Sequence, residues 1–494
     1  MSEPKRIASI LVCGGGVVGL SAATAFARAL PRARVQVLDL DPDPAALADR
    51  MPGTLPAVRF FHRLIGIEEP RLVRQAGVTH RIGTRFDQWS ADGESWHHAF
   101  GIYGASMLAS PFRHQWARMR SEGRALSFDH YAPVTAIARA DKFVYPPDDP
   151  SSLLSSFDYA LRLDPELYGR VLLDEAVRAR VEMRKGTIGE VRRSADDRVE
   201  AVMLTDGEEL RGDLFIDCAG PTAPVLSAVS PDFEDWSESL PCDRLLIGRT
   251  SAGAPSPVDI AAATPSGWRM AIPMQSGRLI CAAYSSKLSD DDAMPTEFPE
   301  ETGIHEFEQI AIRPGRRKSW VGNVVGFGDS SAAFDPLEAT NLSLAQSTIR
   351  RAVSLLPDAD FLPVLLDEYN RQTQVEAERV RDFIAVHYLA STRTEGDFWS
   401  DMPRREKPDS LKHTLEQFIG RARLPKYEEE TFDEESWLAV LFGLGLMPER
   451  VDPTAYRIPE DEVLAMMERV EVMSADVPNQ LPPYPEYLAR LISG

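Results

Sequence analysis

A run of three glycines near the start of the chain constrains its fold more than any other feature. The motif G-x-G-x-x-G at residues 14–19 follows an apolar run at residues 7–13 and precedes an alanine-rich segment with helical periodicity at residues 17–30. The segment RVQVL at residues 34–38 then has the composition of a β-strand. Strand, glycine turn, helix and strand in this order predict the first unit of a parallel α/β sheet.

Each glycine of the motif has a task in binding a dinucleotide. Gly14 allows a tight turn, Gly16 lets the backbone approach a pyrophosphate, and Gly19 permits close packing of the helix on the strand. The helix N-terminus supplies N–H donors and a partial positive charge to the phosphates. Asp39 ends the next strand, where a carboxylate would bind a ribose hydroxyl, and Asp41 is an alternative. The pattern predicts a dinucleotide site; a structural glycine turn is the simpler alternative.

Two later segments bear on whether the dinucleotide is FAD or NAD. Residues 199–217 predict a hairpin that turns at Asp206-Gly207 and ends in the strand of LFIDCAG, which contains Asp217 and Gly220. Residues 319–327 predict another strand, and this strand leads into Gly328 and Asp329. Flavoprotein monooxygenases carry similar distant Gly-Asp segments beside their cofactor. This resemblance favours FAD.

Composition excludes several classes of function. The 494 residues carry 75 acidic and 54 basic side chains, a net charge of −21 that disfavours binding to nucleic acid or to a membrane surface. No apolar run approaches the ~18 residues that span a bilayer. The four cysteines form no CxxC pair, which is typical of a reducing compartment, and the nine histidines show no metal spacing. We expect a soluble, cytoplasmic protein without a metal site.

Six segments together resemble the flavin-dependent tryptophan halogenase family. They are the glycine motif, LFIDCAG at 214–220, SGWRMAIPM at 266–274, DPLEATN at 335–341, DFIAVHYLASTR at 382–393 and GLGLMPER at 443–450. The resemblance covers nearly the whole chain. It implies reduced FAD supplied by a separate flavin reductase, a small aromatic substrate, and a halide that is oxidised to hypohalous acid and reaches the substrate through a tunnel. A homodimer is left open.

The resemblance also implies a fold. We expect an α/β protein with a glutathione-reductase-like FAD-binding module, a parallel sheet from non-contiguous segments, a mixed substrate lobe and C-terminal helices. The approximate boundaries are 1–60, 190–225 and 315–350 for the FAD-binding module, 61–189 and 226–314 for the substrate lobe, and 351–494 for the helical region. The cofactor-binding residues implied are Gly14, Gly16, Gly19, Asp39, Asp217, Gly220, Gly328, Asp329 and Pro336.

The expected catalytic residues depart from the family pattern. Arg81 stands where the family has a lysine at the end of the tunnel, and a guanidinium stays protonated where a buried amine could lose its proton. The family's glutamate is retained as Glu338. Glu338 has two equally weighted interpretations. It could form a structural ion pair with Arg81, or it could act as an acid/base at the end of the tunnel.

The halide and flavin surroundings also differ from the family. The family's Thr-Gly pair at the halide is here Thr340-Asn341, and the asparagine side chain would crowd a halide-sized gap. Met270 replaces the second tryptophan of the family's W-x-W-x-I-P element. The strap segment at residues 49–56 keeps its T-x-P end but loses the family's glycines and glutamate, which puts the coupling of flavin and halide sites in doubt.

Substrate-side residues are partly retained. His98, Phe100, Trp268 and Trp437 match family residues at the substrate, although ordinary packing would also account for a lone His or Trp. The tyrosines and glutamate that hold free tryptophan are absent, so we expect another indole-type or aromatic substrate. The alternatives are a flavin monooxygenase that has lost halide binding and a flavin-binding accessory protein with degraded catalysis.

Overall fold

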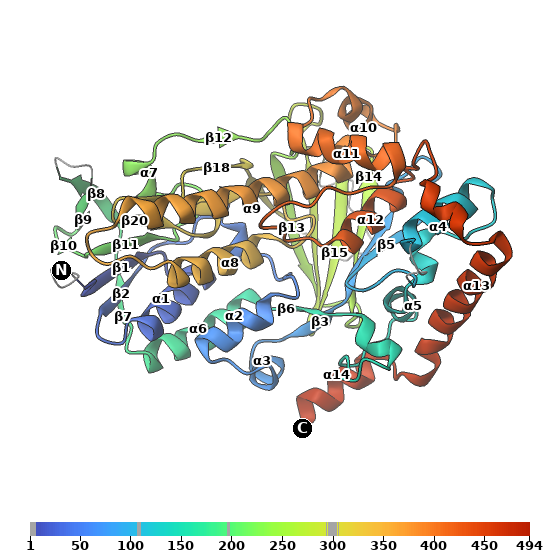
Figure 1. Ribbon diagram of the computed structural model, residues 1–494. Coiled ribbons are helices and arrows are strands. Elements are labelled where there is room, and N and C mark those ends of the chain that lie inside the picture. The colour runs from blue at the N-terminus through green and yellow to red at the C-terminus, as the bar shows by residue number, and fades with distance from the viewer. Residues whose placement is uncertain (1–5, 106–109, 195–197, 293, 295–303, 305) are drawn as a thin grey trace. The chain divides into compact units, whose positions relative to one another are not determined.

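The computed structural model describes residues 6–105, 110–194, 198–292, 294, 304 and 306–494. The chain divides into two compact units, and each consists of three chain segments. The first unit contains residues 1–78, 161–237 and 310–378, and the second contains residues 79–160, 238–309 and 379–494. Figure 1 labels their helices and strands.

The first unit is built on a six-stranded sheet with the order β19-β20-β11-β1-β2-β7. β1 pairs in parallel with β2 and β11, β2 with β7, and β11 with β20. The predicted α/β class, with a parallel sheet from non-contiguous segments, is thereby confirmed. The strands are β1 (Ser9–Cys13), β2 (Arg34–Asp39), β7 (Glu182–Lys185), β11 (Leu214–Asp217), β19 (Trp320–Val321) and β20 (Val324–Gly326).

Two of the predicted elements of this unit can be compared directly with the structure. The hairpin of β9 (Val199–Leu204) and β10 (Glu209–Leu210) turns at Gly207, whose φ is 90°, as predicted. The single strand expected at residues 319–327 is wrong. Gly322, with a φ of 54°, turns the chain back, so β19 and β20 are antiparallel neighbours.

Helices α1 (Val17–Ala29), α6 (Pro165–Arg178) and α8 (Asn341–Ser354) pack side by side next to this sheet (Figure 1). Residues 17–27 of α1 are all buried, and most of them are small. Small side chains allow this close packing of helices and sheet. The other elements of the unit are η1 (Leu47–Asp49), α2 (Val58–Ile65), α3 (Glu69–Gln75), β8 (Ile188–Arg193), α7 (Leu226–Val229), β12 (Glu234–Asp235), β18 (Gly315–Arg316), η6 (Gly328–Ser330) and β21 (Ala332–Ala333).

The second unit contains a mixed sheet in which β13, β16, β15, β14, β4 and β5 are successive neighbours. β4 pairs in parallel with β14 and antiparallel with β5. The strands are β3 (Thr79–Arg81), β4 (Gly83–Asp87), β5 (Trp96–Ala99), β13 (Arg244–Thr250), β14 (Val258–Thr264), β15 (Gly267–Met274) and β16 (Gly277–Tyr284). The sheet brings residues 81–100 next to residues 258–274, which are distant in sequence.

Helices dominate the C-terminal part of the second unit, in agreement with the C-terminal helices that the family resemblance implied. They are α10 (Asp397–Asp401), α11 (Asp409–Arg421), α12 (Glu434–Gly443), α13 (Glu460–Asp476) and α14 (Tyr484–Ser493); earlier helices are α4 (Phe112–Ser121), η2 (Phe128–Tyr131), α5 (Pro133–Arg139) and η3 (Leu153–Ser156). Three elements cross from one unit into the other: β6 (Ala160–Arg162), β17 (Glu308–Ala311) and α9 (Pro363–Leu389).

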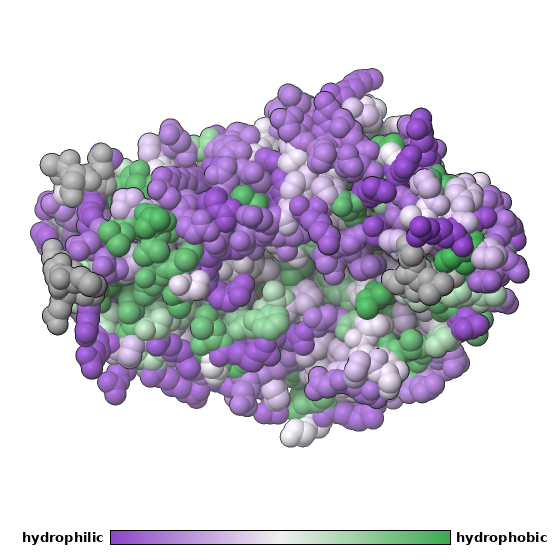
Figure 2. All heavy atoms as spheres, in the orientation of Figure 1, coloured by the Kyte–Doolittle hydropathy of each residue, from purple (hydrophilic) through white to green (hydrophobic). Residues whose placement is uncertain are grey.

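The interior is rich in aromatic side chains. All eight tryptophans are at most 5% exposed. Hydrophilic residues dominate the face of the molecule drawn in Figure 2, in keeping with the acidic composition. None of the helices among the described residues combines the length and the apolar character that a membrane span requires.

Candidate functional site

The glycine motif forms the turn between β1 and α1. The amide N–H of Gly14 donates to the carbonyl of Leu38 at 2.9 Å, and Gly14 has a φ of 115°. A Cβ atom on Gly14 would lie 2.7 Å from the carbonyl carbon of Cys218, and one on Gly19 would lie 2.9 Å from the carbonyl carbon of Gly14. Neither position has room for a side chain.

The carboxylate of Asp49 lies at the N-terminus of α1. Its Oδ1 accepts a hydrogen bond from the amide N–H of Val18 at 2.7 Å, and a Cβ atom on Gly16 would lie 2.5 Å from its Cγ. Burial raises the pKa of Asp49 to about 6, although hydrogen bonds from the N–H groups of Val18 and Val17 lower it. An anionic group of this chain therefore stands where the motif predicts a phosphate.

Asp329 belongs to the same polar region. Its Oδ2 accepts a hydrogen bond from the amide N–H of Ala48 at 2.8 Å. Burial raises its pKa to about 7, and the negative charges of Asp49 and Asp43 act in the same direction. The neighbouring Gly328 has a φ of 62°, a conformation that favours glycine.

Asp39 and Asp217 end β2 and β11, the two strands that flank β1 in the parallel sheet. A Cβ atom on Gly15 would lie 2.8 Å from the Cγ of Asp39, so this carboxylate covers the glycine turn. Asp217 is fully buried and accepts hydrogen bonds from the N–H groups of Ala219, Val225 and Leu226 at 2.8–3.0 Å and from the hydroxyl of Ser330 at 3.1 Å. Asp217 thus orders the loop that carries Gly220, whose φ is 83°.

These residues fit a dinucleotide in three respects. The glycine turn leaves the backbone bare, the N-terminus of α1 already donates to a carboxylate as it would to a phosphate oxygen, and the carboxylate of Asp39 lies at the end of β2. The carboxylate of Asp49 is a stand-in for the anion that this cradle can bind.

The segment 335–341 forms a tight turn into α8. The amide N–H of Ala339 donates to the carbonyl of Pro336 at 3.2 Å, and Ala339 has a left-handed φ of 57°. Thr340 then caps α8, and Nδ2 of Asn341 donates to the carbonyl of Phe334 at 3.0 Å. In the part of the chain that the structure describes, the buried Oγ1 of Thr340 and Oδ1 of Asn341 have no hydrogen-bond partner. Glu338, within the same turn, is also fully buried.

The strap at residues 49–56 contacts this turn. A Cβ atom on Gly53 would lie 2.6 Å from the Cβ of Ala339, and the amide N–H of Leu55 donates to Oγ of Ser343 at 2.8 Å. The strap that begins with Asp49 thus reaches the N-terminal end of α8, although its sequence has lost the family's glycines. The close approach at Gly53 leaves no room for a side chain at this position.

Arg81 forms a buried ion pair in the second unit. Its Nε donates to Oδ2 of Asp259 at 2.6 Å, a second nitrogen donates to Oγ1 of Thr84 at 2.7 Å, and the side chains of Arg81 and Asp259 are 1% and 2% exposed. The guanidinium also lies 4.9 Å from the ring centroid of Phe100. No motif of the sequence pointed to Asp259, which lies 178 residues from Arg81.

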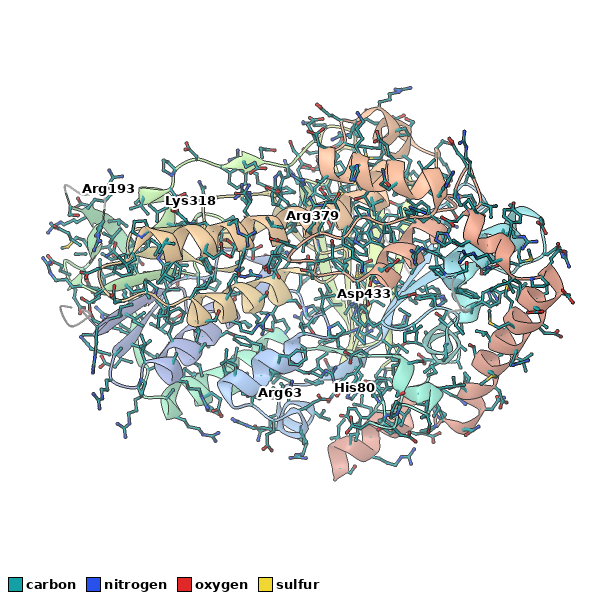
Figure 3. The ribbon with its side chains drawn as sticks, viewed as in Figure 1. Arg63, His80, Arg193, Lys318, Arg379 and Asp433 are labelled. Carbon is teal, nitrogen blue, oxygen red and sulfur yellow. The ribbon has the colours of Figure 1, made fainter. Side chains whose placement is uncertain are left out.

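An aromatic cluster fixes the strand that carries Arg81. His80, labelled in Figure 3, is bonded through Nδ1 to the hydroxyl of Tyr484 at 3.1 Å and through Nε2 to the hydroxyl of Tyr145 at 3.0 Å. Its ring stacks on Phe143 at a centroid distance of 4.3 Å. The C-terminal helix α14, through Tyr484, therefore holds β3 in place.

The predicted substrate residues of β5 and α12 belong to one aromatic cluster in the second unit. The ring of His98 lies 5.7 Å from Phe100, 5.4 Å from Phe383 and 6.0 Å from Phe432. Phe383 in turn lies 5.1 Å from Trp437. Because Arg81 contacts Phe100, the structure joins Arg81 to these substrate residues through a continuous set of rings.

Trp268 lies in β15, and its indole N–H donates to the hydroxyl of Tyr388 at 2.6 Å. The thiol of Cys242 lies 3.9 Å from the same hydroxyl. Met270, which replaces a family tryptophan, is 2% exposed and is paired with Ala261 and Cys281 in the sheet. Tyr388 is a further residue that the sequence did not indicate, although it lies within the family-like segment 382–393.

Part of the acidic segment 428–435 is not a solvated face, contrary to the simplest interpretation of its charge. Oε1 of Glu430 accepts a hydrogen bond from the indole N–H of Trp437 at 3.2 Å, and Oε2 of Glu435 accepts one from the amide N–H of Tyr103 at 3.2 Å. Burial raises the pKa of Glu430, and it raises that of Glu435 to about 7. Asp433, labelled in Figure 3, caps α12 between them.

Metal ligands are not gathered anywhere in the described ranges: no group of three or more His, Cys, Asp or Glu residues there is arranged to hold a metal ion. The four cysteines are free and buried.

Comparison with known proteins gives matches along nearly the whole chain. The family model described as tryptophan halogenase matches residues 9–460. The tryptophan 7-halogenase RebH of Lentzea aerocolonigenes is 26% identical, over 92% of this chain and 93% of its own length.

Solved structures agree with this match. BrvH, a flavin-dependent halogenase from Brevundimonas sp. BAL3, has a TM-score of 0.91 and 32% identity, covering 98% of this chain and 99% of its own. Xcc4156, a flavin-dependent halogenase from Xanthomonas campestris, has a TM-score of 0.91 and 29% identity, with 99% of both chains covered.

Proposed function

This chain belongs to the tryptophan halogenase family, and from this premise we propose that it is a flavin-dependent halogenase that uses reduced FAD and O2 to halogenate an aromatic, indole-type substrate other than free tryptophan. The observation that carries the proposal is the match over residues 9–460, which includes both the glycine cradle and the buried cluster around Arg81. A separate flavin reductase supplies the reduced cofactor.

The cofactor is held by the first unit. When bound, reduced FAD would supply two of the four electrons that reduce O2, and the halide would supply the other two and become hypohalous acid. The N-terminus of α1 and the bare backbone at Gly14 and Gly16 would hold its phosphates, and Asp39 would bind its ribose. Gly220, Gly328, Asp329 and Pro336 belong to the loops that complete this site, and Asp217 orders one of them.

The halide is assigned to the N-terminus of α8. The positive end of a helix attracts anions, and the hydroxyl of Thr340 offers a donor that no described acceptor uses. The side chain of Asn341 is held on the carbonyl of Phe334, so the amide stays beside the helix end rather than turning into solvent. We therefore expect halide to bind, but more weakly than it would beside the family's glycine.

Arg81 acts in this proposal as a fixed cation and not as an amine nucleophile. Its guanidinium is held by Asp259 and Thr84 and lies over Phe100, so its fixed positive charge can attract and orient hypohalous acid near the proposed substrate rings. Glu338 is the candidate acid/base of the reaction. His98, Phe100, Trp268 and Trp437 are the proposed substrate residues.

The decisive experiment is product analysis with a complete reaction mixture. Purified protein, FAD, an unrelated flavin reductase, NADH and either bromide or chloride are incubated with indole, tryptamine and tryptophan, and masses are read. We expect monohalogenated indoles, more with bromide because bromide is easier to oxidise, and little product from tryptophan. Flavin binding without any product from any substrate would contradict the proposal and favour an accessory protein.

A flavin monooxygenase is the second candidate, and the side chain of Asn341 beside Thr340 is the observation that favours it. In that case a product 16 mass units heavier forms without halide. The variant Asn341→Gly separates the two activities, because it removes the side chain at the helix end and is expected to increase bromination only in a halogenase.

Assembly and location complete the proposal. The four free, buried cysteines suit a cytoplasmic protein. A homodimer is the alternative to a monomer, and light scattering of the purified protein distinguishes the two.

A further inference from the structure

We propose that Asp49 is a residue of the flavin site whose carboxylate occupies the pyrophosphate position in the ligand-free protein and has to leave when FAD binds. This inference rests on the proposed function in one respect, since it takes FAD as the ligand. In this proposal, competition by the carboxylate of Asp49 determines how tightly FAD binds.

The position of the carboxylate is the first argument. Oδ1 of Asp49 lies 2.7 Å from the amide nitrogen of Val18, in the first turn of α1. A Cβ atom on Gly16 would lie 2.5 Å from Cγ and 2.8 Å from Oδ1 of the same side chain. Gly16 is the glycine that lets a pyrophosphate approach the backbone, so Asp49 and a pyrophosphate compete for one place.

The segment that carries Asp49 covers the rest of the site, which is the second argument. The amide N–H of Ala48 donates to Asp329, and a Cβ atom on Gly220 would lie 3.0 Å from the Cβ atoms of Asp43 and Ala46. Residues 43–49 thus lie across the glycines of the turn after β1 and of the loop after β11. FAD binding therefore displaces more than one side chain.

Charge is the third argument. Asp49 interacts electrostatically with two groups that lose protons, the carboxyl of Asp329 from η6 and the thiol of Cys218 after β11, and the charge of Asp43, from the loop before η1, acts in turn on Asp329. The neighbouring Arg50 donates to the carbonyl of Pro44 at 2.8 Å. A pyrophosphate entering this site meets these carboxylates, so removing the charge of Asp49 lowers both the competition and the repulsion.

Binding of two flavins to native protein and to variants tests the inference. FAD and riboflavin are titrated by flavin fluorescence at pH 8 against the native chain, Asp49→Asn, Asp49→Ala and the control Glu200→Gln. Glu200 is exposed on β9, so its variant removes one negative charge away from the site. We expect the Kd for FAD to fall roughly tenfold in both Asp49 variants, because a charge-assisted hydrogen bond no longer has to be broken.

Riboflavin separates the pyrophosphate from the ring. It has the same ring system and no phosphate, so its affinity should be the same in all four proteins. Because a protonated Asp49 competes less, native affinity for FAD should also rise as the pH falls from 8 to 6. In Asp49→Ala the increase in FAD affinity between pH 8 and pH 6 should be smaller, because only the protonation of Asp329 would still contribute to it.

Amide hydrogen exchange in α1 tests the contact between Asp49 and Val18 in the ligand-free proteins, without any cofactor. The amide of Val18 should be protected in the native ligand-free protein, exposed in ligand-free Asp49→Ala, and protected again when FAD is added. Equal FAD affinity in native and Asp49 variants, or an equal gain for riboflavin, would overturn the inference and leave the proposed flavin site intact. Absence of FAD binding in every protein would overturn the proposed function and with it the inference.

Discussion

At the scale of single residues, the pair of Arg81 and Asp259 shows how a substitution is stabilised within a buried site. Both side chains are almost fully buried, and the charge of each is balanced by the other. A lysine at position 81 would also face the carboxylate of Asp259. Such a pair favours the protonated amine, so Arg81→Lys alone does not restore a neutral amine at this place.

We expect Asp259→Asn to lower the free energy of unfolding by about 3–5 kcal/mol, because it removes the carboxylate charge that faces the buried guanidinium of Arg81. Denaturant unfolding of the native protein, Asp259→Asn, Arg81→Met and the double variant measures this loss. The double variant should lose clearly less than the sum of the two single variants. Two small and additive losses would show that the ion pair contributes little.

The residues of the site differ in how far the sequence could predict them. Family-like motifs pointed to Arg81, His98 and Trp437 because each stands next to a recognisable segment. Asp259 has no such segment, and it meets Arg81 only because β14 pairs in parallel with β4. Contacts between strands this far apart in sequence leave no local pattern.

At the scale of elements, α1 and its glycine turn are decisive for the cofactor. We expect Gly16→Val to weaken FAD binding at least about 100-fold, because the new side chain fills the place where the backbone meets the phosphates. Fluorescence titration with FAD measures the effect.

The matched control is Gly169→Ala, in α6 of the same unit. A Cβ atom there meets nothing within 4 Å, so this variant should gain up to about 1 kcal/mol of stability and keep its FAD affinity. Unchanged affinity in Gly16→Val would move the dinucleotide site away from α1.

Elements with strong local signals could be predicted well. The strand, helix and strand of the first forty residues lie within a few residues of their predicted bounds. The antiparallel turn between β19 and β20 was missed because a run of apolar residues conceals Gly322. The fold of Asp49 onto α1 was missed because it depends on tertiary contact and not on periodicity.

At the scale of the whole molecule, buried ionisable groups make stability depend on pH. Burial raises the pKa of Asp49 to about 6 and those of Asp329 and Glu435 to about 7. The contribution of such a carboxyl group to the free energy of unfolding is fully present below its pKa in the unfolded chain, near ~4. This contribution is lost as the pH rises toward and through the raised pKa of the folded protein. His62 and His114 have pKa values lowered to about 4, and their cost disappears as the unfolded histidines deprotonate above ~6.5.

We therefore expect the ligand-free protein to lose about 1–2 kcal/mol of stability between pH 6 and pH 8. Between pH 6 and pH 8 the three carboxyl groups lower the free energy of unfolding by about 3 kcal/mol, and the two histidines raise it by about 1.5 kcal/mol. Urea unfolding at constant ionic strength measures the change. Asp329→Asn should reduce the loss by about 1 kcal/mol, and a protein that becomes more stable toward pH 8 would contradict the expectation.

The burial of all eight tryptophans has a consequence for an enzyme that produces an electrophile for indole rings. Each of these tryptophans is itself an indole and would otherwise compete with the substrate. Oxidant that escapes into solvent meets instead the thioethers of Met183 and Met473, which are 40% and 45% exposed. Their oxidation gives sulfoxides that cells can reduce again. Burial thus keeps the indole rings of this protein out of reach of oxidant in solvent, while the exposed thioethers stay open to reversible oxidation.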